Sequence, residues 1–242
     1  MTIAGILFDK DGTLLDYAAS WPPINRRAAA LAAGGDVELA ERLLRSGGAD
    51  PASGRVTPDS VLAAGTTAEI AAAWVEAGAR FSAAALTAAL DRLFSAAAAE
   101  VVPVTDLASL FGRLRARGVR LGVASSDNET SIRLTAERFG ISHLVDFMAG
   151  YDSGFGSKPG AGMIEGFCRS TALAARQVAM VGDNAQDLLM GRAAGAGRVI
   201  GVLTGTGTYA TLAPLADLCL ASIAGIEAAL FPQPSATFRP ME

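Results

Sequence analysis

The chain has 242 residues, a formal net charge of −4 and a sequence pI near 5.1, long enough for one large domain or for a core with an inserted domain. The acidic balance, without long runs of like charge, argues against nucleic acid or a membrane as a partner. The first apolar run ends at Asp9, too early for a secretion signal or a membrane span. Cys168 and Cys219 stand alone, which argues against a disulfide framework or a zinc site.

The composition is uneven in two respects. Residues 16–100 are about a third alanine, against about one-seventh elsewhere, and alanine is the best helix former. The 20 basic residues include only two lysines, Lys10 and Lys158. The alanine-rich block predicts a helical segment built differently from its flanks, and the two lysines are candidates for special roles. Since no secretion signal or membrane span is predicted, we expect a soluble, cytoplasmic protein.

The predicted elements begin with a buried strand at 3–8, which ends in the turn Asp9-Lys-Asp-Gly12. No further strand is predicted up to residue 100. Alanine- and leucine-rich stretches separated by glycines predict helices at 25–34, 37–46, 67–79 and 82–99, with a long loop at 47–59. After Pro103 the pattern alternates, with helices predicted at 105–117, 128–139, 161–172, 185–194 and 223–231 and strands at 119–124, 145–149, 177–181, 199–203 and 218–221.

This order predicts the α/β class: a doubly wound parallel sheet with an inserted α-helical cap domain. The first strand belongs to the later sheet, so residues 1–16 and 101–231 form the predicted core and 17–100 the cap. Residues 232–242, with three prolines, are predicted to form a loose tail. In such sheets ligands bind at the carboxyl ends of the strands, near the point where the strand order reverses.

Polar residues stand at the predicted strand ends. Asp9 and Asp11 follow the first strand, where the alternation of extended backbone points both carboxylates the same way, and Gly12 permits a sharp exit. By the same alternation Lys10 is predicted to point away from them. Ser125 and Ser126 follow the second strand at the start of a helix, a favourable place for an anion.

Three further residues complete the set. Lys158 precedes the helix at 161–172, Asp183 ends the fourth strand, and Asp187 lies one helical turn later on the same side. Ligands that are all oxygen suit Mg²⁺. A carboxylate held beside Mg²⁺, Ser125 and Lys158 can attack a phosphoryl group, and a second carboxylate can protonate the leaving alcohol and later deprotonate water.

With these motifs in this order, the sequence resembles the haloacid dehalogenase superfamily of phosphohydrolases, and within it the phosphoglycolate phosphatase-like group with a helical cap. The resemblance spans nearly the whole chain and implies a Mg²⁺-dependent phosphatase that acts on a small phosphate monoester through an aspartyl-phosphate. It implies these roles: Asp9 as nucleophile, Asp11 as general acid and base, Ser125 and Lys158 as ligands of the phosphoryl group, and Asp9, the Asp11 carbonyl and Asp183 as ligands of Mg²⁺, with Asp187 supporting the metal site directly or through water. Gly12 and Ser126 are further candidates for contact with the substrate.

Other branches of the superfamily fit less well or stay open. Dehalogenases do not need Asp11 or the Asp183 and Asp187 pair, and phosphonoacetaldehyde hydrolases need a cap lysine that is missing here. A sugar-phosphate phosphatase or a β-phosphoglucomutase-like phosphotransferase stays open. A phospho-accepting regulatory module would use a similar aspartate, but such modules are about half this length and have no helical insertion. The sequence allows a monomer or a homodimer.

Several other residues give weaker signals of function. Arg55, in the long cap loop, is a candidate to pair with a carboxylate or phosphate of the substrate. Tyr17 and Trp21 are interpreted as packing at the hinge to the cap. His143 is interpreted as a helix-end or loop residue, and the glycine- and threonine-rich stretch at 201–208 as a flexible loop near the rim of the site.

Overall fold

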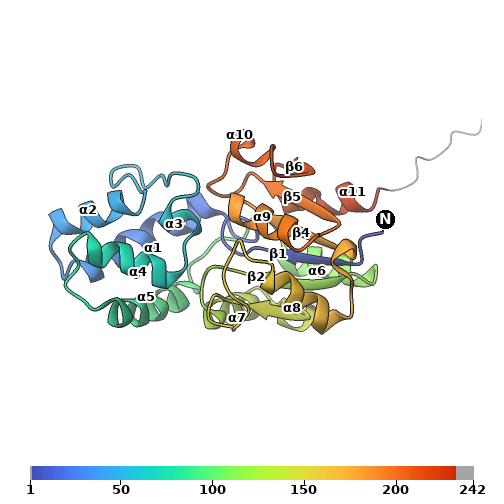
Figure 1. Ribbon diagram of the computed structural model, residues 1–242, viewed down its shortest axis with the longest axis horizontal. Helices are drawn as coiled ribbons and strands as arrows, with labels where there is room; N and C mark the ends of the chain where they lie inside the picture. The colour runs from blue at the N-terminus through green and yellow to red at the C-terminus, as the bar shows by residue number, and fades with distance from the viewer. Residues whose placement is uncertain (1, 233–242) are drawn as a thin grey trace, which may run out of the picture.

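The computed structural model describes residues 2–232 (Figure 1). All but the first residue of the predicted loose tail at 232–242 therefore lies outside the described residues. Within them, no helix has the length and apolar character needed to cross a lipid bilayer. Cys168 and Cys219 are both free, in agreement with the prediction that no disulfide joins them.

The core contains one sheet of six parallel strands in the order β3-β2-β1-β4-β5-β6. At the centre, Phe8 of β1 lies opposite Val123 of β2 on one side and Val181 of β4 on the other. The strand order reverses at β1, so the switch point lies at its carboxyl end, and the predicted doubly wound α/β fold is confirmed. The strands are β1 (Gly5–Phe8), β2 (Arg120–Ala124), β3 (Phe147–Ala149), β4 (Val178–Gly182), β5 (Arg198–Val202) and β6 (Leu218–Leu220).

Helices cover both faces of this sheet. On one face Phe8 stacks on Phe111 of α6, with ring centroids 5.3 Å apart, and on the other face Leu7 joins the buried cluster of Phe167 in α8. Neighbouring residues of β1 thus feed opposite layers, which explains why the strand is apolar throughout. The core helices are α6 (Leu107–Ala116), α7 (Glu129–Arg138), α8 (Gly162–Thr171), α9 (Ala185–Ala193), α10 (Tyr209–Leu212) and α11 (Ile226–Leu230).

Five helices between β1 and α6 pack on one another at one end of the core (Figure 1). Trp74 is fully buried among them, and Trp21 packs edge-to-face on Phe94. These helices are α1 (Tyr17–Ala32), α2 (Val37–Ser46), α3 (Val61–Ala64), α4 (Thr67–Glu76) and α5 (Ala83–Ala97). We refer to residues 17–100 as the cap.

The first cap helix begins at Tyr17, whereas the sequence predicted residues 25–34. Asp16 caps it, since its carboxylate accepts a hydrogen bond of 3.0 Å from the amide of Ala19. Pro22 and Pro23 then lie inside the helix. Proline removes a backbone donor and normally ends or begins a helix, so the sequence pattern alone favours a later start than the structure shows.

Candidate active site

A cavity lies between the cap and the carboxyl ends of β1, β2 and β4. The core contributes Asp9, Asp11, Ser125, Ser126, Asp127, Lys158, Asp183, Asn184, Gln186 and Asp187, and the cap contributes Tyr17, Trp21, Asn25, Leu62, Ala63, Ala64, Gly65, Thr67, Ile70 and Phe94.

Polar contacts hold the cap against the core around this cavity. The Ser126 hydroxyl donates to the carbonyl of Ala64 at 3.0 Å, and the Asn184 carboxamide donates to the carbonyl of Ala63 at 3.2 Å. On another side the Ser95 hydroxyl of α5 donates to the Asn128 side chain at 3.0 Å. The cap is therefore docked on the core, and residues from both parts line the same cavity.

Lys158 bridges two carboxylates on the core side of the cavity. Its Nζ lies 2.6 Å from Asp9 Oδ1 and 2.6 Å from Asp187 Oδ1. Burial alone would lower the pKa of Lys158, but the charges of Asp187 and Asp9 outweigh burial and raise that pKa above its usual value. Lys158 is therefore a permanent positive charge at the end of β1.

Asp9, Asp183 and Asp187 form a compact carboxylate cluster, with one oxygen of each within 4.8 Å of the others. Burial raises the pKa of Asp9 to about 6, with Lys158 opposing the shift. Burial, together with the charges of Asp9 and Asp187, raises the pKa of Asp183 well above its usual value. Three carboxylates share one lysine, so full ionisation of the cluster requires a further positive charge.

Two atoms of this cluster test whether a metal ion would fit. Asp9 Oδ2 and Asp183 Oδ1 are buried and have no hydrogen-bond partner, a costly state for carboxylate oxygens. Hard divalent cations bind oxygen ligands of this kind. The cluster therefore fits a divalent metal ion, which would satisfy both oxygens and offset the repulsion between the carboxylates.

The stretch after β5 packs directly on Asp183. The amide of Thr206 donates to Asp183 Oδ2 at 2.9 Å, and the Asn184 carboxamide donates to the same oxygen at 3.0 Å. A side chain at Gly205 would overlap the Asp183 carboxylate. Sequence reasoning placed this loop near the rim but missed its contact with Asp183; its only signal was Thr204-Gly-Thr-Gly-Thr208 after a strand.

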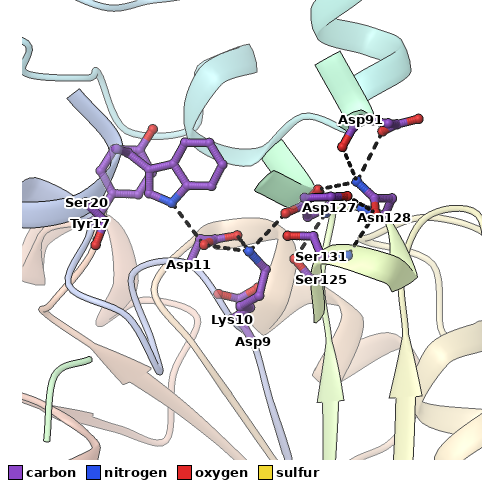
Figure 2. Close-up of polar contacts among 12 residues, drawn as sticks. Asp9, Lys10, Asp11, Tyr17, Ser20, Asp91, Ser125, Asp127, Asn128 and Ser131 are labelled. Atoms are coloured by element: carbon purple, nitrogen blue, oxygen red, sulfur yellow. Dashed lines mark hydrogen bonds and ion pairs between the residues drawn. The ribbon is translucent and has the colours of Figure 1, made fainter. Parts of the chain in front are cut away.

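Lys10 occupies a second buried position between carboxylates (Figure 2). Its Nζ lies 2.7 Å from Asp11 Oδ2 and 3.0 Å from Asp127 Oδ2. The prediction that Lys10 points away from the aspartates was therefore wrong with respect to Asp11. The strand ends at Phe8 and the chain bends at Lys10, so the alternation of extended backbone no longer applies there.

Asp11 is held from two sides. The indole nitrogen of Trp21 donates to Asp11 Oδ1 at 2.9 Å, and Lys10 pairs with the same carboxylate. Burial raises the pKa of Asp11 to about 6, Lys10 opposes the shift, and the charges of Asp127 and Asp9 add to it. Trp21 is thus more than hinge packing, because it fixes the predicted acid and base.

A polar chain continues from Lys10 to the cap (Figure 2). Asp127 Oδ1 accepts hydrogen bonds from the backbone amide and the carboxamide of Asn128, at 2.8 and 3.0 Å. The Asn128 carboxamide also lies 3.3 Å from Asp91 Oδ1 in α5. Asp127 was missed by sequence reasoning, although it directly follows the two predicted serines.

The structure brings most of the other predicted residues to the cavity. Ser125 lines it and its hydroxyl accepts a hydrogen bond from the Asp127 amide at 3.1 Å. Ser126 lines it too, but its hydroxyl is bound to the cap. Gly12 has φ +88°, and a side chain there would lie 2.6 Å from the Asp183 carboxylate, so the turn needs glycine. Arg55 is exposed and outside the residues that line the cavity.

Comparison with known proteins shows which family the chain belongs to. Residues 3–195 match haloacid dehalogenase-like hydrolases. The chain belongs to the haloacid dehalogenase-like hydrolase family. The predicted resemblance is thereby confirmed, and the hydrolase match covers β1 to α9, which hold all the carboxylates of the site.

Individual relatives agree with this placement. A phosphoglycolate phosphatase of Rhodospirillum rubrum is 33% identical over 87 residues, which is 36% of either chain. The crystal structure of CbbY from Rhodobacter sphaeroides in complex with phosphate has a TM-score of 0.68 at 21% identity, covering 93% of this chain and 96% of that one. A predicted phosphoglycolate phosphatase of Haemophilus somnus 129pt has a TM-score of 0.71 at 20% identity, covering 95% and 98%. At these identities the structures support the fold alone.

Proposed function

We propose that this hydrolase is a Mg²⁺-dependent phosphatase that cleaves a small phosphate monoester through an aspartyl-phosphate on Asp9. The observation that carries the proposal is the pair of carboxylates at the end of β1. Asp9 has a free buried oxygen beside Lys158, and Asp11 lines the same cavity two residues later. The phosphoglycolate phosphatase among the relatives supports a small phosphorylated metabolite as the substrate class.

In the first half-reaction the Asp9 carboxylate attacks phosphorus, and the bond from phosphorus to the ester oxygen breaks. Asp11 donates its proton to that oxygen, so the alcohol leaves neutral. The raised pKa of Asp11 suits this task, because the carboxyl group can carry a proton near neutral pH. Lys158 offsets the charge of the phosphoryl oxygens.

In the second half-reaction a water molecule attacks the aspartyl-phosphate. Asp11, now ionised, takes a proton from this water, and the new bond from water oxygen to phosphorus replaces the bond to Asp9. Inorganic phosphate and free Asp9 result. Lys10 and Trp21 keep the Asp11 carboxylate in place between the two half-reactions.

Asp9, Asp183 and Asp187 would hold Mg²⁺, as the free oxygens of Asp9 and Asp183 and the compact arrangement of the three carboxylates support. Bound there, the ion would neutralise charge on the nucleophile and the phosphoryl group. Removal of divalent metal by EDTA is expected to abolish phosphate release, and Mg²⁺ to restore it. Equal restoration by Ca²⁺ would contradict the choice of Mg²⁺, because Ca²⁺ prefers longer bonds and more ligands.

The Asp9→Asn variant tests the nucleophile. It keeps the size of the side chain, so we expect an unchanged unfolding temperature but no measurable phosphate release from any monoester. Asp50→Asn is the matched control, because it makes the same chemical change at an exposed position of the cap loop. Phosphate release by Asp9→Asn at more than a trace of the rate of the unmodified protein would refute the proposal.

A further inference from the structure

The part of the cavity beyond the carboxylates is mostly apolar. Aromatic rings of α1 and α5 form one wall, with the centroids of Tyr17 and Trp21 6.1 Å apart and those of Trp21 and Phe94 5.3 Å apart. Leu62 and Ile70 line it as well. This wall faces the side of the site that the alcohol part of a bound ester would occupy, because the phosphoryl group must lie at Asp9.

The charge around the cavity is one-sided. Among the described residues that line it, Lys158 is the only cation, and it already contacts Asp9 and Asp187. The cap has seven arginines, and every one is exposed and outside the lining: Arg26, Arg27, Arg42, Arg45, Arg55, Arg80 and Arg92. The lining carboxylates number five: Asp9, Asp11, Asp127, Asp183 and Asp187.

A substrate with a second anionic group would therefore bury that charge against carboxylates and apolar side chains without a partner. Burial of an unpaired charge is among the most costly events in a protein interior. The cap is docked on the core through Ser126 and Asn184, so these walls are the ones a bound substrate would meet. Phosphoglycolate, whose alcohol part carries a carboxylate, fits these walls poorly.

One polar group interrupts the apolar wall. Asn25 lines the cavity and is 2% exposed, and its Nδ2 lies near the Tyr17 hydroxyl without a hydrogen bond of good geometry. A buried donor of this kind is costly unless a ligand accepts from it. It could bind one neutral oxygen of a substrate, such as a hydroxyl or carbonyl.

We propose that the preferred substrates are phosphate monoesters of an uncharged, largely apolar or aromatic alcohol, and that a carboxylate on the alcohol is rejected. This inference rests on the proposed phosphatase function and narrows its substrate class. The aromatic wall and the donor of Asn25 provide the recognition, and the absence of a free cation among the described lining residues provides the rejection.

Matched substrate pairs test the inference. Para-carboxybenzyl phosphate differs from benzyl phosphate only by its carboxylate. Phosphoglycolate carries a carboxylate where hydroxyethyl phosphate carries a neutral hydroxymethyl group. We expect kcat/KM to be at least about tenfold higher for the neutral member of each pair, and higher for benzyl than for hydroxyethyl phosphate. Equal or better use of the carboxylate-bearing members would overturn the inference while leaving the phosphatase proposal intact. Failure to release phosphate from all four esters would overturn the phosphatase proposal instead.

A variant that adds a cation sharpens the test. Ile70→Arg places a guanidinium on the lining of the cavity, and we expect it to shift the preference within each pair toward the carboxylate by about tenfold. Val37→Arg is the control, because Val37 is 72% exposed in α2, away from the cavity; its preference should not change. Thr67→Lys offers a second lining position if Ile70→Arg does not fold. An unchanged preference in a folded lining variant would contradict the charge argument.

Discussion

The two lysines of this chain lie in two halves of one site and are used differently. Both are buried between two carboxylates, Lys158 between Asp9 and Asp187 and Lys10 between Asp11 and Asp127. The halves differ in how many carboxylate oxygens have no partner. Around Lys158 stand three carboxylates with two free oxygens, whereas the Asp11 carboxylate already has Lys10 and Trp21 as partners.

This difference explains how neighbouring aspartates of one turn can do different work. The Asp9 half keeps negative charge and lone pairs for an external cation and for phosphorus. The Asp11 half is internally paired, which fixes the position of a group that must give and take protons. The following changes separate the two halves, from the largest expected effect to the smallest.

Lys158→Met removes the cation from the Asp9 half. Asp9 and Asp187 then lack their shared partner, and the phosphoryl group loses a positive contact. We expect kcat/KM to fall by about 10²–10³ for every monoester, irrespective of the leaving alcohol. Steady-state phosphate release measures the effect. A loss confined to esters with poor leaving groups would show that Lys158 acts on proton donation in the Asp11 half, which would contradict this assignment.

Lys10→Met removes the cation from the Asp11 half. With alkyl phosphates, whose leaving oxygen needs a proton, we expect kcat to fall by about 10²-fold. With para-nitrophenyl phosphate the leaving group needs no proton, so a rapid burst of nitrophenolate should persist and be followed by slow turnover.

Stopped-flow measurement of that burst distinguishes positioning of Asp11 from general damage to the site. Arg133→Met is the matched control, since Arg133 pairs with Glu129 on the exposed surface of α7. A burst rate reduced as strongly as the alkyl phosphate turnover would show that Lys10 does not act through Asp11.

Gly205→Ala changes the Asp9 half without replacing a carboxylate. The added methyl group would overlap Asp183 and displace the loop that donates the Thr206 amide. We expect the Mg²⁺ concentration for half-maximal activity to rise by about tenfold, with a smaller effect at saturating Mg²⁺. Gly112→Ala in α6 has open space around its new methyl group and should leave the Mg²⁺ titration unchanged; a similar shift there would remove the special role of Gly205.

Arg55→Ala is expected to have the smallest effect. Its side chain is exposed and does not line the cavity, so kcat/KM should stay within about twofold of the unmodified protein, as for most surface changes. A larger loss of kcat/KM on the best substrate would show that Arg55 contacts the substrate. It would also contradict the inference that the cap supplies no cation to the cavity.

The sequence alone determined the sheet and the positions of the principal carboxylates. Short apolar strands alternating with helices specify parallel βαβ units, and in such units the residues after each strand meet at one edge. Asp9, Asp183 and Asp187 could therefore be assigned to one place from local periodicity, although more than 170 residues separate the first two. These are consequences of backbone periods, which a sequence displays directly.

Only the tertiary structure decided which side chains meet beyond the ends of the regular strands and helices. Lys10 turns to Asp11 because the strand stops at Phe8, and Trp21 reaches Asp11 because Asp16 starts α1 ahead of two prolines. Thr206 finds Asp183 only through the packing of the loop after β5. Whether the cap arginines face the cavity was likewise undecided in the sequence, since the direction of a side chain on a helix has meaning only once the helix has been packed against its neighbours.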